Sequence, residues 1–201
     1  MAINVANNNS LSAITALPSA VSGGAMTLLE TQTASSSSTI SFTSNIDSTY
    51  KEYIFKFYDI HPATNDTTLG FQGNAAGGSG YNETITSTHF ISQHAESDAE
   101  ASVEYRAAAD QAQGTSFQIL TAGTGNDNDQ SCSGYLHLFN PSDTTFVTHF
   151  IARVNSAHAS DYQVESYVAG YFNTTSAIDE IQFKMSSDEI DTGVIKLYGI
   201  K

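Results

Sequence analysis

Apolar and polar side chains alternate with a period of two through the stretch from Ala177 to Lys201. This period indicates a β-strand with one buried and one exposed face, because successive side chains point to opposite sides of a strand. A first segment has its apolar side chains at Ile178, Ile181, Phe183 and Met185. After a polar turn at residues 186–193, a second segment alternates between two sets, Ile195 with Leu197 and Lys196 with Tyr198. The pattern predicts two strands that form a closing hairpin.

Similar stretches recur along the chain between turn residues. The strongest, Tyr50 to Ile60, is apolar on both faces, which predicts a central strand that Pro62 ends. Other strands are predicted at residues 26–33, 39–43, 67–73, 81–91, 116–121, 133–139, 144–154 and 161–171. Turns at intervals of roughly 8 to 15 residues are typical of a sandwich or a jelly roll.

Composition also favours an all-β domain. The 11 Phe and 10 Tyr suit pleated surfaces, whereas only 7 Lys and Arg are present to form charge-laced helices. A chain of 201 residues is long enough for one β domain with a sizeable core. We therefore expect a single jelly-roll-like β-sandwich over residues 26–201, with a polar connection at 34–38 and an exposed glycine-rich loop at 75–80.

One helix is expected within this domain, at residues 97–113. Ala99, Val103 and Ala107 follow helical spacing, and Ser97 with Glu100 has the spacing of a capping box. The predicted fold is thus an all-β, jelly-roll-like sandwich with one short helix.

The first 25 residues differ from the rest of the chain. They are rich in Asn, Ser, Ala and Gly, carry scattered apolar residues, and end near Gly23 and Gly24. Such a segment cannot bury enough apolar surface alone to offset the entropy cost of ordering. We predict an extended N-terminal attachment or assembly arm at residues 1–25 that contacts another protein; a disordered terminus is the alternative.

The C-terminal pattern resembles a known group of proteins. The spaced residues Ile178, Ile181, Phe183 and Met185, followed by Ile195-Lys196-Leu197-Tyr198-Gly199-Ile200, are similar to a strand pair that recurs in tailed-bacteriophage virion proteins with C-terminal jelly-roll-like domains. Residues 28–33 and the strand ending in Ile60-His61-Pro62 extend the resemblance. The resemblance implies a non-enzymatic structural component of a virion, displayed as a capsid decoration or fibre subunit. The expected partners are other virion proteins and further copies of the chain.

Charge limits the remaining partners. A formal net charge of -14 repels phosphate backbones, so no nucleic-acid partner is expected. No Lys or Arg precedes Lys51 and no apolar run approaches the length of a membrane helix, so neither a secretory signal nor membrane insertion is expected. Cys132, the only cysteine, cannot form an intrachain disulfide and is predicted to be a small buried apolar residue.

The sequence offers few candidates for chemistry. The loop Asn126 to Asp129 has oxygen ligands suited to Ca²⁺ but lacks the EF-hand spacing, so a solvated turn is the preferred interpretation. His89 and His94 are five residues apart, which places them on opposite faces of an extended strand and denies them a shared metal ion. His137 and His149 fall in strand patterns. No nucleophile elbow, P-loop or dinucleotide motif occurs, and the paired carboxylates Asp179 with Glu180 and Asp188, Glu189 and Asp191 fall in polar positions. We therefore expect no enzyme activity, and no catalytic, cofactor or metal residues.

Carbohydrate binding is the alternative function, as the adhesin module of a tail fibre that recognises host-surface glycans. Jelly-roll modules often hold sugars on exposed aromatic side chains, but this chain has no Trp. The candidates are Tyr81, Tyr105, Tyr135, Tyr162, Tyr167 and Tyr171, and packing on β faces is the competing interpretation for most of them.

Overall fold

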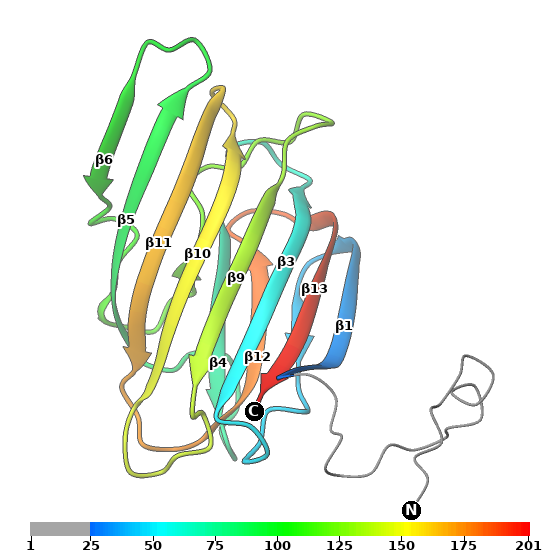
Figure 1. Ribbon diagram of the computed structural model, residues 1–201, viewed down its shortest axis with the longest axis vertical. Helices are drawn as coiled ribbons and strands as arrows, with labels where there is room; N and C mark the ends of the chain where they lie inside the picture. Colours follow the sequence, from blue (N-terminus) through cyan, green and yellow to red (C-terminus); the bar gives the residue numbers. More distant parts are fainter. Residues whose placement is uncertain (1–24) are drawn as a thin grey trace, which may run out of the picture.

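The computed structural model describes residues 25–201, in which every regular element is a β-strand (Figure 1). Eight strands form the path of a large antiparallel sheet, in the order β1 (Met26–Ser37), β13 (Ile190–Ile200), β3 (Glu52–Pro62), β9 (Cys132–Phe139), β10 (Thr148–His158), β11 (Tyr162–Phe172), β5 (Ile85–Ala95) and β6 (Ala101–Tyr105). The ninth strand, β7 (Ala112–Gly114), pairs with β5. A smaller sheet has the order β2 (Ile40–Phe42), β12 (Ile178–Met185), β4 (Leu69–Ala75) and β8 (Gln118–Ile119).

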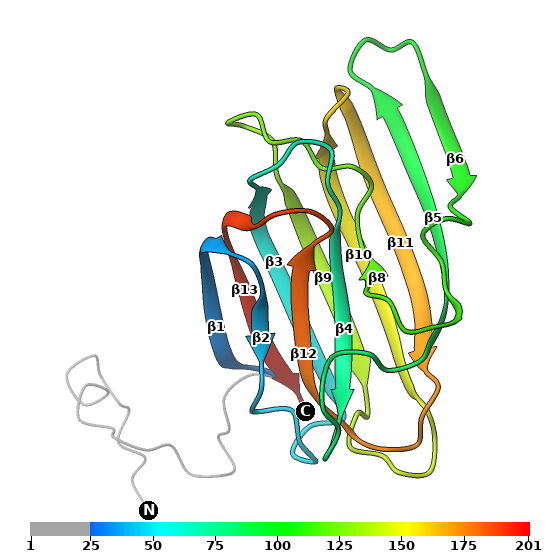
Figure 2. The same cartoon turned by 180° about the vertical axis from the view of Figure 1, so that it is seen from behind.

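The two sheets pack face to face as a jelly-roll-like β-sandwich, which confirms the predicted fold class. Figure 2 shows the four-stranded sheet covering one face of the nine-stranded sheet. The opposite face of the large sheet, turned toward the viewer in Figure 1, has no covering layer among the described residues. We call it the outer face.

Aromatic side chains join the sheets in the core. Phe183 of β12 lies with its ring centroid 5.3 Å from those of both Phe55 and Phe57 of β3. Phe71 of β4 makes an edge contact with Phe150 of β10 at 5.0 Å. These residues occupy the inward positions of strands whose alternate side chains face outward, as a sandwich requires. The period-two pattern thus correctly predicts which side chains are buried.

The predicted hairpin at the end of the chain is wrong. β12 belongs to the small sheet, where it pairs with β2 and β4, whereas β13 pairs with β1 and β3 in the large sheet. The connection after Met185 crosses from one layer to the other, and β13 begins at Ile190 rather than at residue 194. The alternation is the same in both arrangements, because two amphipathic strands bury their apolar faces equally well beside each other or across a core.

The predicted helix at residues 97–113 is also wrong. This segment forms the edge strand β6, a turn, and the short strand β7. Asp98 adopts a left-handed backbone conformation, with φ of 60°, close to where the capping box was expected. An apolar helix face made mostly of Ala offers little burial, whereas the open edge of β5 offers backbone hydrogen bonds to both segments.

Two expectations about strands have opposite outcomes. β3 lies between β13 and β9 and ends at Pro62, so the predicted central strand is confirmed. The polar connection predicted at residues 34–38 is instead the continuation of β1, which pairs with β13 as far as Ser37 and buries Ala34. The predicted arm at residues 1–25 lies outside the described residues except for Ala25.

Candidate functional site

The outer face of the large sheet presents three rows of side chains that cross six neighbouring strands. Strand register defines each row, since residues directly opposite each other share a face. In the order β5, β11, β10, β9, β3, β13, the cationic row is Phe90, Tyr167, Arg153, Tyr135, Lys56 and Lys196. The middle row is Thr88, Ala169, Ile151, His137, Ile54 and Tyr198. The lower row is Thr86, Tyr171, His149, Phe139, Glu52 and Ile200.

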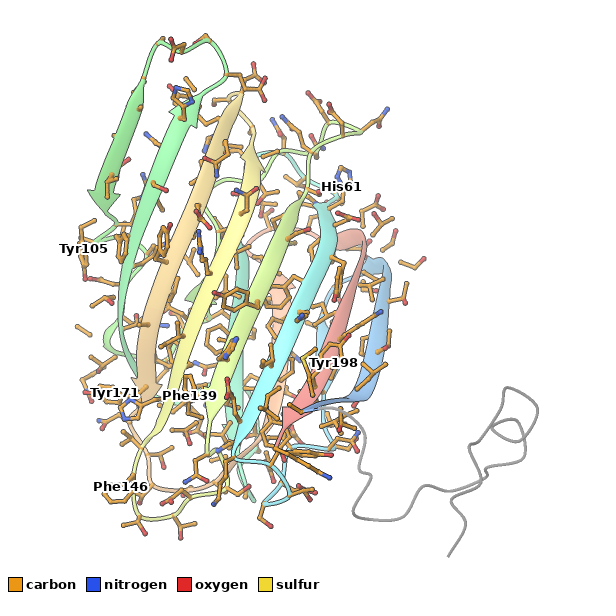
Figure 3. The ribbon with its side chains drawn as sticks, in the orientation of Figure 1. His61, Tyr105, Phe139, Phe146, Tyr171 and Tyr198 are labelled. Carbon is orange, nitrogen blue, oxygen red and sulfur yellow. The ribbon has the colours of Figure 1, made fainter. Side chains whose placement is uncertain are left out.

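Large apolar side chains are unusually exposed on this face. Phe90 is 42% exposed, Tyr135 36% and Ile151 50%. Figure 3 shows the labelled Phe139 and Tyr171 over the same face. Patches of this kind on a folded domain mark interaction or ligand-binding surfaces.

The rows enclose two adjoining depressions. One has a volume of about 480 Å³ and is walled by Tyr171, His149 and Phe139 of the lower row. The other, of about 250 Å³, is walled by aromatic side chains of the cationic row. Both are lined by Thr88, Ile151 and Ala169 of the middle row, which separates them. The small side chains of Thr88 and Ala169 between taller aromatic ones produce a trough that runs across the strands.

Contacts among the wall residues fix their positions. The rings of Phe90 and Tyr167 are stacked, with centroids 4.7 Å apart and an interplanar angle of 6°. The Arg153 guanidinium lies 5.2 Å from the centroid of the Tyr167 ring and also pairs with Glu165, which raises the pKa of Arg153 and lowers that of Glu165. In the lower row, His149 packs edge-on against Tyr171. The side chains that line the trough are therefore held against one another.

The electrostatics of this face differ from those of the whole chain. The three rows hold three of the seven Lys and Arg residues but only one of the 21 Asp and Glu residues, Glu52, which is hydrogen-bonded to His137. With a net charge of -14, most of the acidic side chains must lie elsewhere. The three rows are therefore a locally basic strip on an acidic protein, and Glu165, the next outward side chain of β11, pairs with Arg153.

The structure brings together some of the tyrosines named from the sequence. Tyr135, Tyr167 and Tyr171 belong to the three rows, and Tyr105 of β6 lies opposite Phe90. Tyr81 instead donates to Glu180, and Tyr162 packs against a small second core. Sequence reasoning missed Phe90 and the cations of the row, because outward positions on strands far apart in the chain give no local signal.

Of the histidines, the prediction for His89 and His94 is confirmed: they lie on opposite faces of β5, one buried and one exposed. His89 is 1% exposed, and neither ring nitrogen has a hydrogen-bond partner in the described part of the chain. It borders a cavity of about 130 Å³ beneath the segment that contains Arg106 and Ala109. Burial, followed by the positive charge of Arg106, lowers the pKa of His89 to about 4. His137 and His149 lie in strands β9 and β10, as predicted.

The Asn126–Asp129 loop borders a polar depression of about 510 Å³ at one end of the sandwich. His61, Asp59 and Asp191 also line it, and His61 Nδ1 lies 2.7 Å from the carbonyl oxygen of Gln130. Among residues 25–201, no three His, Cys, Asp or Glu side chains are placed to hold a metal ion. The solvated turn remains the interpretation of this loop.

The other candidates are scattered. Cys132 is buried, as predicted, and burial raises the pKa of its thiol to about 12. Burial, together with the neighbouring Glu180, raises the pKa of Asp179. No helix within residues 25–201 has the length and apolar character to cross a membrane.

Comparisons of the chain with protein-family models, with curated proteins and with solved structures find no match.

Proposed function

We propose that this protein is a non-enzymatic structural component of a tailed-phage virion, displayed on the particle surface as a capsid decoration or fibre subunit. The observation that supports this most is the position of the segment that carries the resemblance. Residues 178–200 contribute β12 to the small sheet and β13 to the large one, and Phe183 of β12 packs against β3. The resembling sequence therefore contributes a strand to each layer of the sandwich and one of the connections between them.

The proposed attachment device is the arm at residues 1–25, which contacts other virion proteins or further copies of this chain. Its junction with the sandwich is at the sheet edge, where the Lys201 amide donates to the Ala25 carbonyl at 3.0 Å. β1, which follows at once, is the edge strand of the large sheet. Edge strands can pair with an added strand, and main-chain pairing then supplies affinity.

Locating the protein on intact particles tests this proposal. Antibodies raised against the sandwich should label the head or the tail of purified virions in electron microscopy. A deletion of residues 2–24 should leave the sandwich folded, as judged by its β-type circular dichroism, and should lose incorporation into particles. Purified virions that lack the protein would refute the virion role, whereas full incorporation of the deletion would refute only the role of the arm.

The trough on the outer face favours a second candidate function, the binding of a glycan. Sugar rings have apolar faces and hydroxyl edges, and a trough with aromatic walls and polar groups at its rim suits both. On a glycan array, the wild-type chain should bind at micromolar affinity, and Tyr135→Ala should weaken binding. Tyr81→Ala is the matched control, because Tyr81 lies away from the three rows. Equal binding by both variants would exclude the trough as the site.

A further inference from the structure

The cationic row contains an arrangement that folding alone does not favour. Lys56 of β3 and Lys196 of β13 lie directly opposite each other in an antiparallel pair. Like charges directly opposite each other repel and destabilise the strand pair. The chain has 21 carboxylates, yet within residues 25–201 neither ammonium group forms an ion pair.

Both ammonium groups are instead held over aromatic rings. Lys56 Nζ lies 5.7 Å from the centroid of the Tyr198 ring, and Lys196 Nζ lies 5.3 Å from that of Tyr58. Cation–π contacts orient a charge without neutralising it. Two adjacent positive charges are thus positioned and remain available to an anion.

The same row supplies a third cation and an apolar part. Arg153 uses its Nε–H for Glu165, which leaves its terminal amino groups able to donate to a ligand. Beyond it lie the stacked rings of Phe90 and Tyr167. Six neighbouring strands about 4.8 Å apart give the row a length of roughly 24 Å, which suits an elongated ligand that crosses the strands.

We propose that the outer face binds a linear acidic polysaccharide along the cationic row, with carboxylate or sulfate groups at Lys56, Lys196 and Arg153 and sugar rings against the aromatic side chains. This inference rests on the glycan-binding function proposed above and specifies its ligand class by charge complementarity. Charge-assisted hydrogen bonds to the three cations supply selectivity against neutral glycans.

A single-stranded nucleic acid fits the row less well. It carries one charge per nucleotide and needs cations along its whole length. Here the cations are confined to Arg153, Lys56 and Lys196, whereas Phe90 and Tyr167 at the other end of the row are uncharged.

The test uses the full chain and native gel electrophoresis in the presence of polymers. The acidic probes are polygalacturonate, hyaluronate, alginate and heparin; dextran is the neutral probe and poly(dT) the nucleic-acid probe. We expect at least one acidic polysaccharide to change the mobility of the protein, with a change that weakens as salt is raised, and dextran to have little effect. Lys56→Gln/Lys196→Gln should weaken binding by about tenfold or more.

The matched control is Lys51→Gln/Lys184→Gln, which removes the same charge from positions outside the three rows and should bind like the wild type. Thermal melts establish that both double variants are folded. Equal weakening by both pairs would overturn the proposed site, and stronger binding of poly(dT) would overturn the ligand class. If the protein binds dextran, and the Lys56→Gln/Lys196→Gln variant binds it equally well, the proposal of an acidic ligand is refuted but glycan binding is retained. Failure of every polysaccharide to bind would refute both.

Discussion

Acid should destabilise this protein through one buried histidine, His89. Its pKa is lowered from 6.5 to about 4, first by burial and then by Arg106, with the Ala109 backbone and Asp110 acting in the opposite direction. Between these two values the unfolded chain binds a proton that the folded chain excludes, so the free energy of unfolding must fall as pH falls. The effect begins near pH 6.5 and is complete below pH 4.

The size of this effect follows from the two pKa values. A difference of about 2.5 pH units corresponds to a full loss of roughly 3 kcal/mol, of which about 2 kcal/mol should already be lost between pH 7.5 and pH 5. That is a substantial fraction of the stability of a typical domain.

Urea unfolding at a series of pH values measures this loss directly. His89→Gln and His89→Leu remove the titrating group. Between pH 7.5 and pH 5, the free energy of unfolding should therefore fall by about 2 kcal/mol less in each variant than in the wild type. Other acidic and basic groups contribute to all three curves and cancel in the difference. Parallel curves for the wild type and both His89 variants would refute the reasoning.

Three further predictions test the packing. Phe183→Ala should lower the free energy of unfolding by about 3–5 kcal/mol in urea melts, whereas Phe146→Ala, at a side chain 70% exposed, should change it by less than about 0.5 kcal/mol; similar effects would contradict the assigned core. Cys132 should resist thiol reagents at pH 8 in the folded state and react in urea, since burial raises its pKa to about 12; rapid native labelling would contradict its burial. Gly134→Ala should lower the free energy of unfolding by about 1–3 kcal/mol, because the added methyl group would collide with the Arg153 carbonyl. An unchanged melting curve would show that β9 and β10 move apart enough to accommodate the methyl group.

The sequence predicts burial better than it predicts pairing. Alternation correctly places Phe55 and Phe57 of β3 inside, and Ile195 and Leu197 of β13 inside. It fails at the connection between β12 and β13, because the pattern specifies a buried face but not the layer that covers it. The helix prediction is wrong for a related reason. Residues 101–105 have only a weak local preference for either helix or strand, and pairing with the open edge of β5 determines their conformation.

The cationic row shows why the candidate site could not be predicted from the pattern alone. A one-residue slip of β13 would turn Lys196 into the core and expose Leu197, so hydrophobic burial excludes it. A two-residue slip, however, preserves both faces and would place Lys196 opposite Ile54 or Tyr58 instead of Lys56. Two register shifts on either side of Thr192 set the actual alignment, and no apolar pattern marks them. Because this register brings two like charges together, the alternation alone does not select it; the bulged end of β13 and the ring over which each lysine lies are the features that accompany it.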